Sequence, residues 1–64
     1  MDERPLAFDS DSAARMLGVS RRTLERERSA GRICCRYLGS KPLYPFEELK
    51  AWLDSLPSEP PTSL

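Results

Sequence analysis

Apolar and polar positions alternate with helical spacing in the last third of the chain. From Phe46 onward, apolar side chains recur at offsets of three, four and seven positions, at Leu49, Trp52, Leu53 and Leu56. Such offsets place side chains on one face of an α-helix, and charged residues occupy the opposite face, at Glu47, Glu48, Lys50 and Asp54. The pattern predicts an amphipathic helix that ends at Pro57, with Trp52 as a core residue and not a base-stacking aromatic.

A first helix is predicted from its start and stop signals. Asp9 is placed to cap it, and Phe8 is placed to pack onto Ala13 one turn into the helix. The helix runs to about Leu17, because Gly18 supplies the left-handed backbone geometry that ends a helix.

A second helix follows after a tight turn. Ser20 is its predicted cap, and the helix runs from Arg21 to about Ala30, where Gly31 ends it. The two helices are therefore expected to cross at close range.

A β-hairpin is predicted between the second and third helices. Residues 33 to 38 have the β-branched and aromatic content of a strand, residues 39 to 41 are the turn, and residues 43 to 44 form a short returning strand. Because Pro42 and Pro45 confine the returning strand to a sheet edge, we expect a two-stranded hairpin packed on the helices, and no larger sheet. Two aromatic residues are assigned to bracing this hairpin, Tyr37 and Tyr44.

Length and composition bound the chain to one small domain. It has 64 residues and no histidine, and the adjacent Cys34 and Cys35 lack the spacing with which two cysteines bind one zinc ion. We therefore expect reduced thiols and no structural metal. Residues 57 to 64 are rich in proline and serine, which predicts a disordered tail after a domain of residues 1 to 56.

Neither an active site nor a membrane segment is expected. The polar cluster of Asp9, Asp11 and Ser12 lies in the capping turn of the first helix, where carboxylates are favoured by the helix dipole. No apolar run approaches the length of a membrane span, and the first residues are acidic, unlike the basic start of a secretion signal. These features predict a cytosolic protein that is not an enzyme and has no cofactor.

The formal net charge of zero hides a basic centre between acidic flanks. From Arg15 to Lys41 there are eight basic residues against two acidic ones, a formal net charge of +6, and each flank carries −3. This asymmetry indicates a surface for a polyanion such as DNA, and a merely solvated arginine-rich face is the alternative.

The residues around the turn between the first two helices have a characteristic spacing. A small residue is needed where two helices joined by a tight turn cross, and Ala14 stands at that point, four residues before Gly18. Val19 follows as a buried plug, Ser20 as a cap, and Leu24 points back onto the first helix. This is helix-turn-helix spacing, followed directly by the basic segment.

The chain resembles the excisionase-type winged-helix DNA-binding domains related to the MerR family over roughly residues 6 to 56. The matching positions are Ala13-Ala14-x-x-Leu17-Gly18-Val19-Ser20-Arg21-Arg22-Thr23-Leu24, then Gly31, then Tyr44-Pro45-x-Glu47-x-Leu49-x-Ala51-Trp52-Leu53. The chain departs from the family at Glu27 and Arg28, where the family usually has apolar residues. Either these charges pair locally, with Arg32 as a partner, or the helix frays after Arg26 and its arginines contact phosphates.

The resemblance implies a mainly α fold with a small β-hairpin, a winged helix-turn-helix. Its second helix enters the major groove, and the hairpin, the wing, meets the adjacent backbone or minor groove. The DNA-facing pattern of the family falls on Ser20, Arg21, Arg22, Glu25 and Arg26.

The chemistry of these residues fits that task. Arginine donates two hydrogen bonds to guanine, Glu25 accepts from cytosine, and Ser20 holds a phosphate at the helix start. Wing contacts are assigned to Arg36 and Lys41, and Arg28 is added as a DNA contact. For the residues of the second helix the alternative is a phosphate contact that does not depend on base sequence. For Arg36 and Lys41 the alternative is an ordinary solvated charge at the edge of the hairpin.

Three functions remain open. The first, implied by the resemblance, is a phage excisionase, a recombination directionality factor that binds repeated double-stranded DNA sites cooperatively with other copies of itself, bends the DNA and assists an integrase. The second is a small transcriptional repressor of the same fold. The third is a protein-interaction adaptor whose arginines serve solubility alone. Fold and residues do not separate the first two.

Overall fold

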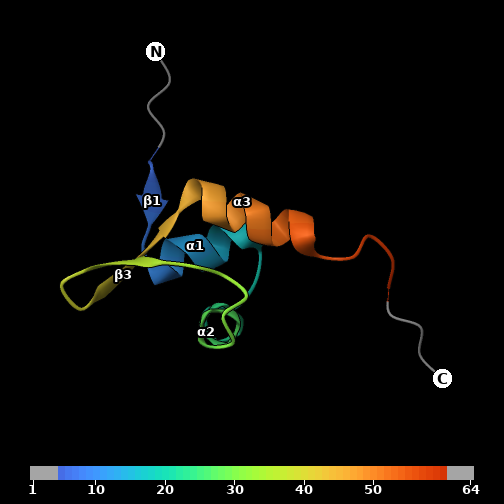
Figure 1. Ribbon diagram of the computed structural model, residues 1–64, viewed down its shortest axis with the longest axis horizontal. Coiled ribbons are helices and arrows are strands. Elements are labelled where there is room, and N and C mark those ends of the chain that lie inside the picture. The colour runs from blue at the N-terminus through green and yellow to red at the C-terminus, as the bar shows by residue number, and fades with distance from the viewer. Residues whose placement is uncertain (1–4, 61–64) are drawn as a thin grey trace, which may run out of the picture.

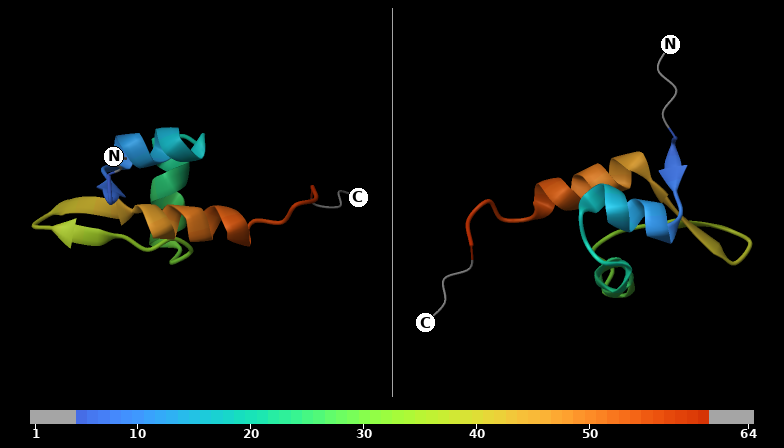
Figure 2. Two further views of the ribbon diagram at one scale, coloured as in Figure 1. Left: turned by 90° about the horizontal axis from the view of Figure 1, so that it is seen from above. Right: turned by 180° about the vertical axis from the view of Figure 1, so that it is seen from behind.

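The computed structural model describes residues 5 to 60. Its elements follow in the order β1 (Ala7–Phe8), α1 (Ser10–Leu17), α2 (Arg21–Ser29), β2 (Arg36–Leu38), β3 (Lys41–Pro45) and α3 (Phe46–Ser55). Helices α1 and α3 lie side by side, α2 lies below them, and the β2–β3 hairpin reaches out to one side (Figures 1 and 2). The predicted mainly α fold with a small hairpin is confirmed.

Some predictions fall partly outside the described residues. Residues 57 to 60 form neither helix nor strand. The last four residues of the predicted tail, 61 to 64, and the first four of the predicted domain, 1 to 4, lie outside the described range. Disorder of the tail therefore stays a prediction. No helix between residues 5 and 60 is long and apolar enough to cross a membrane.

The predicted helix ends and caps are confirmed. The side chain of Asp9 accepts a hydrogen bond from the Ser12 N–H at 2.8 Å, and this bond lowers the pKa of the Asp9 carboxyl. Gly18 takes a φ of 75°, a left-handed conformation that favours glycine. Ser20 Oγ accepts from the Thr23 N–H at 3.1 Å, which caps α2. Local capping chemistry thus sets the turn between α1 and α2.

The sheet is larger than the sequence predicted. It has three strands in the order β1-β3-β2, because β1 pairs antiparallel with the end of β3, Phe8 opposite Tyr44. The expectation of a two-stranded hairpin with β3 at an edge is therefore wrong. Each proline in β3 lies where this strand has a neighbour on one side only: Pro42 opposite Tyr37 of β2, and Pro45 opposite Ala7 of β1. Proline is tolerated at such positions because no second strand needs its missing N–H.

The strand limits also differ from the prediction. β2 covers only Arg36–Leu38, and the preceding residues from Ile33 form no strand. β3 is longer than predicted and begins at Lys41, which was predicted to lie in the turn. Cys34 and Cys35 are free thiols in the segment before β2.

The core lies where α1, α2, α3 and β3 meet. Its buried residues include Ala14 and Leu24 at the predicted crossing of α1 and α2, together with Ala13, Ile33, Tyr44, Leu49 and Trp52. Val19 is half-buried against this cluster, and so less buried than expected. The predicted apolar face of α3 is buried only in part, because Leu53 is 52% exposed. Leu56, predicted on the same face, follows the end of α3 in an extended conformation and is 44% exposed.

Helix α2 does not fray after Arg26. It continues to Ser29, and Glu27 pairs with Arg32 at 2.8 Å, as the local-pairing alternative expected. The same carboxylate accepts a hydrogen bond from Trp52 Nε1 at 3.0 Å. The Arg32 bonds and then the Trp52 bond lower the pKa of Glu27 from 4.5 to about 2. Glu27 therefore ties the end of α2 to the core residue of α3.

Candidate nucleic-acid interface

Helix α2 presents two arginines to solvent on the side opposite the core. Arg22 and Arg26 are one turn apart and exposed, whereas Leu24, between them in sequence, is 1% exposed. Neither arginine forms an ion pair with any residue from 5 to 60. Both guanidinium groups are therefore available to an external acceptor.

Arg21 is held by carboxylates from two helices. Its Nε donates to Glu25 Oε2 at 3.0 Å, one turn along α2, and its Nη1 donates to Asp11 Oδ1 of α1 at 3.2 Å. The Glu25 bond and then the Asp11 charge raise the pKa of Arg21. Because all three side chains are largely exposed, these ion pairs add little stability. Two of the predicted DNA contacts, Arg21 and Glu25, are thus bonded to each other.

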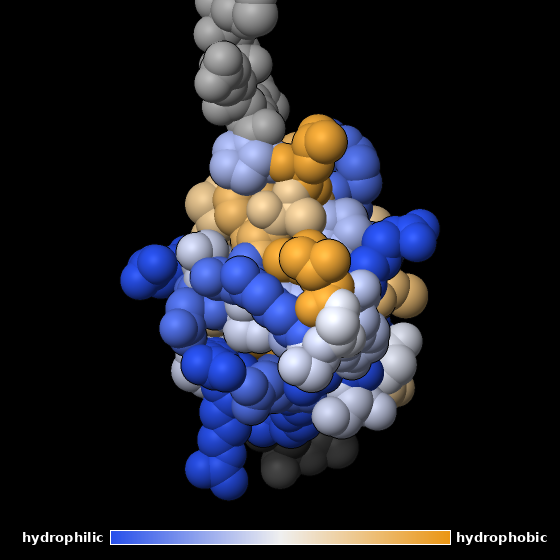
Figure 3. Space-filling view, turned by 90° about the vertical axis from the view of Figure 1, so that its left-hand side faces the viewer, coloured by the Kyte–Doolittle hydropathy of each residue, from blue (hydrophilic) through white to orange (hydrophobic). Residues whose placement is uncertain are grey.

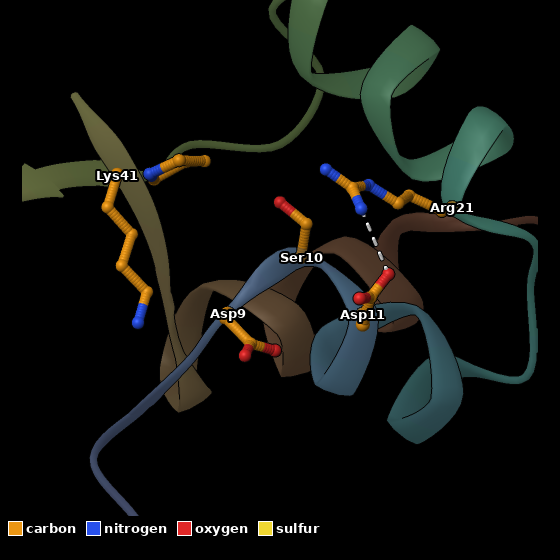
Figure 4. A pocket seen from close by; sticks show the side chains of 6 residues that line it. Asp9, Ser10, Asp11, Arg21 and Lys41 are labelled. Atoms are coloured by element: carbon orange, nitrogen blue, oxygen red, sulfur yellow. Dashed lines mark hydrogen bonds and ion pairs between the residues drawn. The ribbon is translucent and has the colours of Figure 1, made fainter.

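A hollow of about 210 Å³ lies between the start of α1, the start of α2 and the wing. Figure 4 shows Arg21 on its α2 side reaching Asp11, and Lys41 on its wing side next to Asp9. Ser10 lies between them at the first turn of α1. Two of the predicted DNA contacts, Arg21 and Lys41, thus line one hollow. Arg21 is paired there with Asp11, whereas Lys41 has no ion pair with residues 5 to 60.

The wing ends in a two-residue loop. Leu38 pairs with Lys41 as the last rung, and Gly39 in the loop has a φ of 64°. A positive φ at the first loop residue alone fits a two-residue hairpin turn of type II′. Arg36 and Lys41, the predicted wing contacts, are both exposed and form no ion pair with residues 5 to 60.

Arg28 is directed at the wing and not at solvent. Its Nη1 donates to the hydroxyl of Tyr37 at 3.0 Å, and its Nε is buried without a hydrogen-bond partner among the described residues. The nearby hydroxyl of Tyr44 is likewise buried and unpaired, and burial raises its pKa. Sequence reasoning placed Arg28 among the DNA contacts and assigned Tyr37 to the hairpin, but no local pattern signals their bond.

Ser20 has a structural task in addition to its predicted one. Its hydroxyl accepts from the Thr23 N–H and donates to Thr23 Oγ1 at 2.9 Å. Any phosphate at the start of α2 would therefore share a hydroxyl that already caps the helix.

Seen from the wing end, hydrophilic side chains cover the half of the molecule on which α2 lies (Figure 3). Apolar side chains gather on the other half, towards β1. The hydrophilic half of this view therefore includes the side of the protein on which α2 lies. Whether the predicted residues contact DNA stays a prediction.

Helices α1 and α2 cross at Ala14 and are joined by a tight turn that begins at Gly18. With a hairpin beside the second helix, this arrangement defines a winged helix-turn-helix. The family model described as "Helix-turn-helix domain" matches residues 8–57. The chain belongs to this helix-turn-helix domain family, which supports DNA binding as its activity. No match was found among curated proteins or among solved structures.

Proposed function

We propose that this protein is a DNA-bending factor of the excisionase type, which assembles on repeated sites and assists an integrase without being an enzyme itself. The observation that carries the proposal is the arrangement of unpaired cations on two separate elements, Arg22 and Arg26 on α2 and Arg36 and Lys41 on the wing. The helix-turn-helix domain family includes excisionase-like DNA-binding proteins.

The two elements suit adjacent parts of a duplex. The width of the major groove admits an α-helix, and an arginine fork matches the O6 and N7 acceptors of guanine. Arg22 and Arg26 are therefore assigned to base edges or to the phosphates beside them. Arg36 and Lys41 are assigned to the neighbouring backbone, where they set register and affinity more than sequence preference.

The small size of this surface means that a bent complex needs several copies. Bending a short site by tens of degrees costs on the order of 1 to 6 kcal/mol, and four cations on one copy supply few phosphate contacts. Copies on neighbouring sites share this cost. The acidic residues Glu47 and Asp54 of α3 are exposed. They offer a contact to the basic side of the next copy, a heterologous contact that propagates along DNA.

A circular-permutation gel shift tests the proposal. The purified protein is titrated onto duplexes taken from beside its own gene, with the site moved along a fragment of constant length. We expect a ladder of cooperatively filled complexes whose mobility depends on the position of the site. A single complex whose mobility ignores that position would overturn the bending role and favour a simple repressor. No complex even at low salt would favour the adaptor function.

A further inference from the structure

Helix α2 and the wing are attached to the rest of the protein by different contacts. Helix α2 packs against α1, whereas the wing is anchored through β3 to α1 and α3. The tip of the hairpin extends away from the helices in all three ribbon views (Figures 1 and 2). A duplex contacted by both elements at once requires a defined angle between them.

One side-chain hydrogen bond joins the two elements within residues 5 to 60. It runs from Arg28 Nη1 to Tyr37 Oη at 3.0 Å, from the last turn of α2 to the middle of β2. Tyr37 is 58% exposed, so its position depends on this bond more than on packing. Arg28 is half-buried with its Nε fully enclosed, so its guanidinium is seated between the helix and the wing.

The position of Arg28 around the axis of α2 agrees with this assignment. It comes four residues after the buried Leu24 and therefore lies on nearly the same side of the helix. At 3.6 residues per turn, it is rotated by roughly 120° from Arg22 and roughly 160° from Arg26. A guanidinium on this flank points along the protein towards the wing, and not into the groove that Arg22 and Arg26 face.

We propose that Arg28 is a positioning residue that fixes the wing relative to α2 through Tyr37, so that both elements fit the same duplex. This inference rests on the proposed DNA binding and replaces a direct DNA contact of Arg28 by an indirect role. Tyr37 then has an equal share in this role, because its hydroxyl accepts the hydrogen bond from Arg28.

A double-mutant cycle on DNA affinity tests this role. Arg28→Met keeps the apolar stem without the donor, and Tyr37→Phe removes only the hydroxyl. We expect each single change to weaken DNA binding by about three- to tenfold, the loss expected for one hydrogen bond. The double variant should bind DNA as tightly as whichever single variant has the lower affinity. Multiplying losses, or an unchanged affinity of Tyr37→Phe, would overturn the proposal, because a direct phosphate contact by Arg28 does not need the hydroxyl.

Arg26→Met is the matched control, because the same substitution is made one half-turn away on the same helix. Its loss should multiply with that of Tyr37→Phe, since the two residues share no bond. Thermal melting of each variant shows whether it is folded.

A second measurement needs no DNA and separates this inference from the proposed function. Backbone ¹⁵N relaxation of the free protein should show increased mobility of residues 38 to 41 in Tyr37→Phe and in Arg28→Met, and no change in Arg26→Met. Unchanged mobility would contradict the link itself. A wild-type protein with a rigid wing and no DNA binding would instead refute the proposed function.

Discussion

The packing of α2 against α1 gives a quantitative prediction of stability. Leu24 is 1% exposed and is the only buried residue of α2 within its nine residues, so Leu24→Ala leaves a cavity where α2 meets α1. A buried Leu→Ala change costs about 2 to 5 kcal/mol. A domain of this size has a total stability of about 3 to 10 kcal/mol, so this single change removes a large share of it.

Thermal and urea unfolding followed by circular dichroism measure this effect. At about 4 to 8 °C per kcal/mol for a small domain, Leu24→Ala should lower Tm by about 10 °C or more. Leu53→Ala on α3 is the matched control, because the same atoms are removed from a side chain that is 52% exposed, and it should change Tm much less. Equal losses in the two variants would refute the assignment of Leu24 as the contact that seats α2.

Three further predictions concern acid stability and DNA binding. Because bonds from Arg32 and then Trp52 hold the pKa of Glu27 at about 2 against an ordinary 4.5, the stability that this carboxylate contributes is present above about pH 4.5 and is lost as the pH falls towards 2. Urea midpoints across this window should therefore fall more steeply for wild type than for Glu27→Gln, and parallel curves would contradict the pairing. Arg22→Ala should weaken specific binding by about 1 to 3 kcal/mol and relax sequence preference, which competition with random duplex measures; equal losses on both duplexes would refute base reading. Lys41→Ala should weaken all sites alike and flatten the dependence of log K on log salt by about one, and an unchanged slope would exclude a phosphate contact.

Helix limits were predictable because their causes lie within a few residues. The capping oxygens of Asp9 and Ser20 each bond an N–H three positions ahead, and Gly18 adopts its positive φ next to the helix that it ends. Sequence spacing alone carries such local chemistry. Leu24 and Ala14 were predictable for the same reason, because a tight turn forces the residues around it together.

Contacts between distant segments were not predictable in the same way. β1 is only two residues long and pairs with Tyr44 and Pro45, far along the chain, so no alternation of apolar and polar residues predicts it. The exposure of Leu53 was missed because helical periodicity shows which face is apolar but not how far along the helix another element covers it.

The candidate site shows the same division. Placement of Arg22 and Arg26 on one exposed face follows from helical spacing. The bonds of Glu27 to Trp52 and of Arg28 to Tyr37 do not follow from it, because these partners are 25 and nine positions away. Only the tertiary structure identifies these two bonds.

Amide chemical-shift mapping with a duplex from beside the gene tests the central claim most directly. A ¹H–¹⁵N titration of this 64-residue protein resolves α2, the wing and α3 separately. The account predicts that shifts concentrate on Arg22, Arg26, Arg36 and Lys41 and their neighbours, and that the exposed side of α3 around Asp54 is unaffected at one copy per site. Shifts centred on α3, or no shifts at low salt, would contradict the assignment of α2 and the wing as the surface that binds DNA.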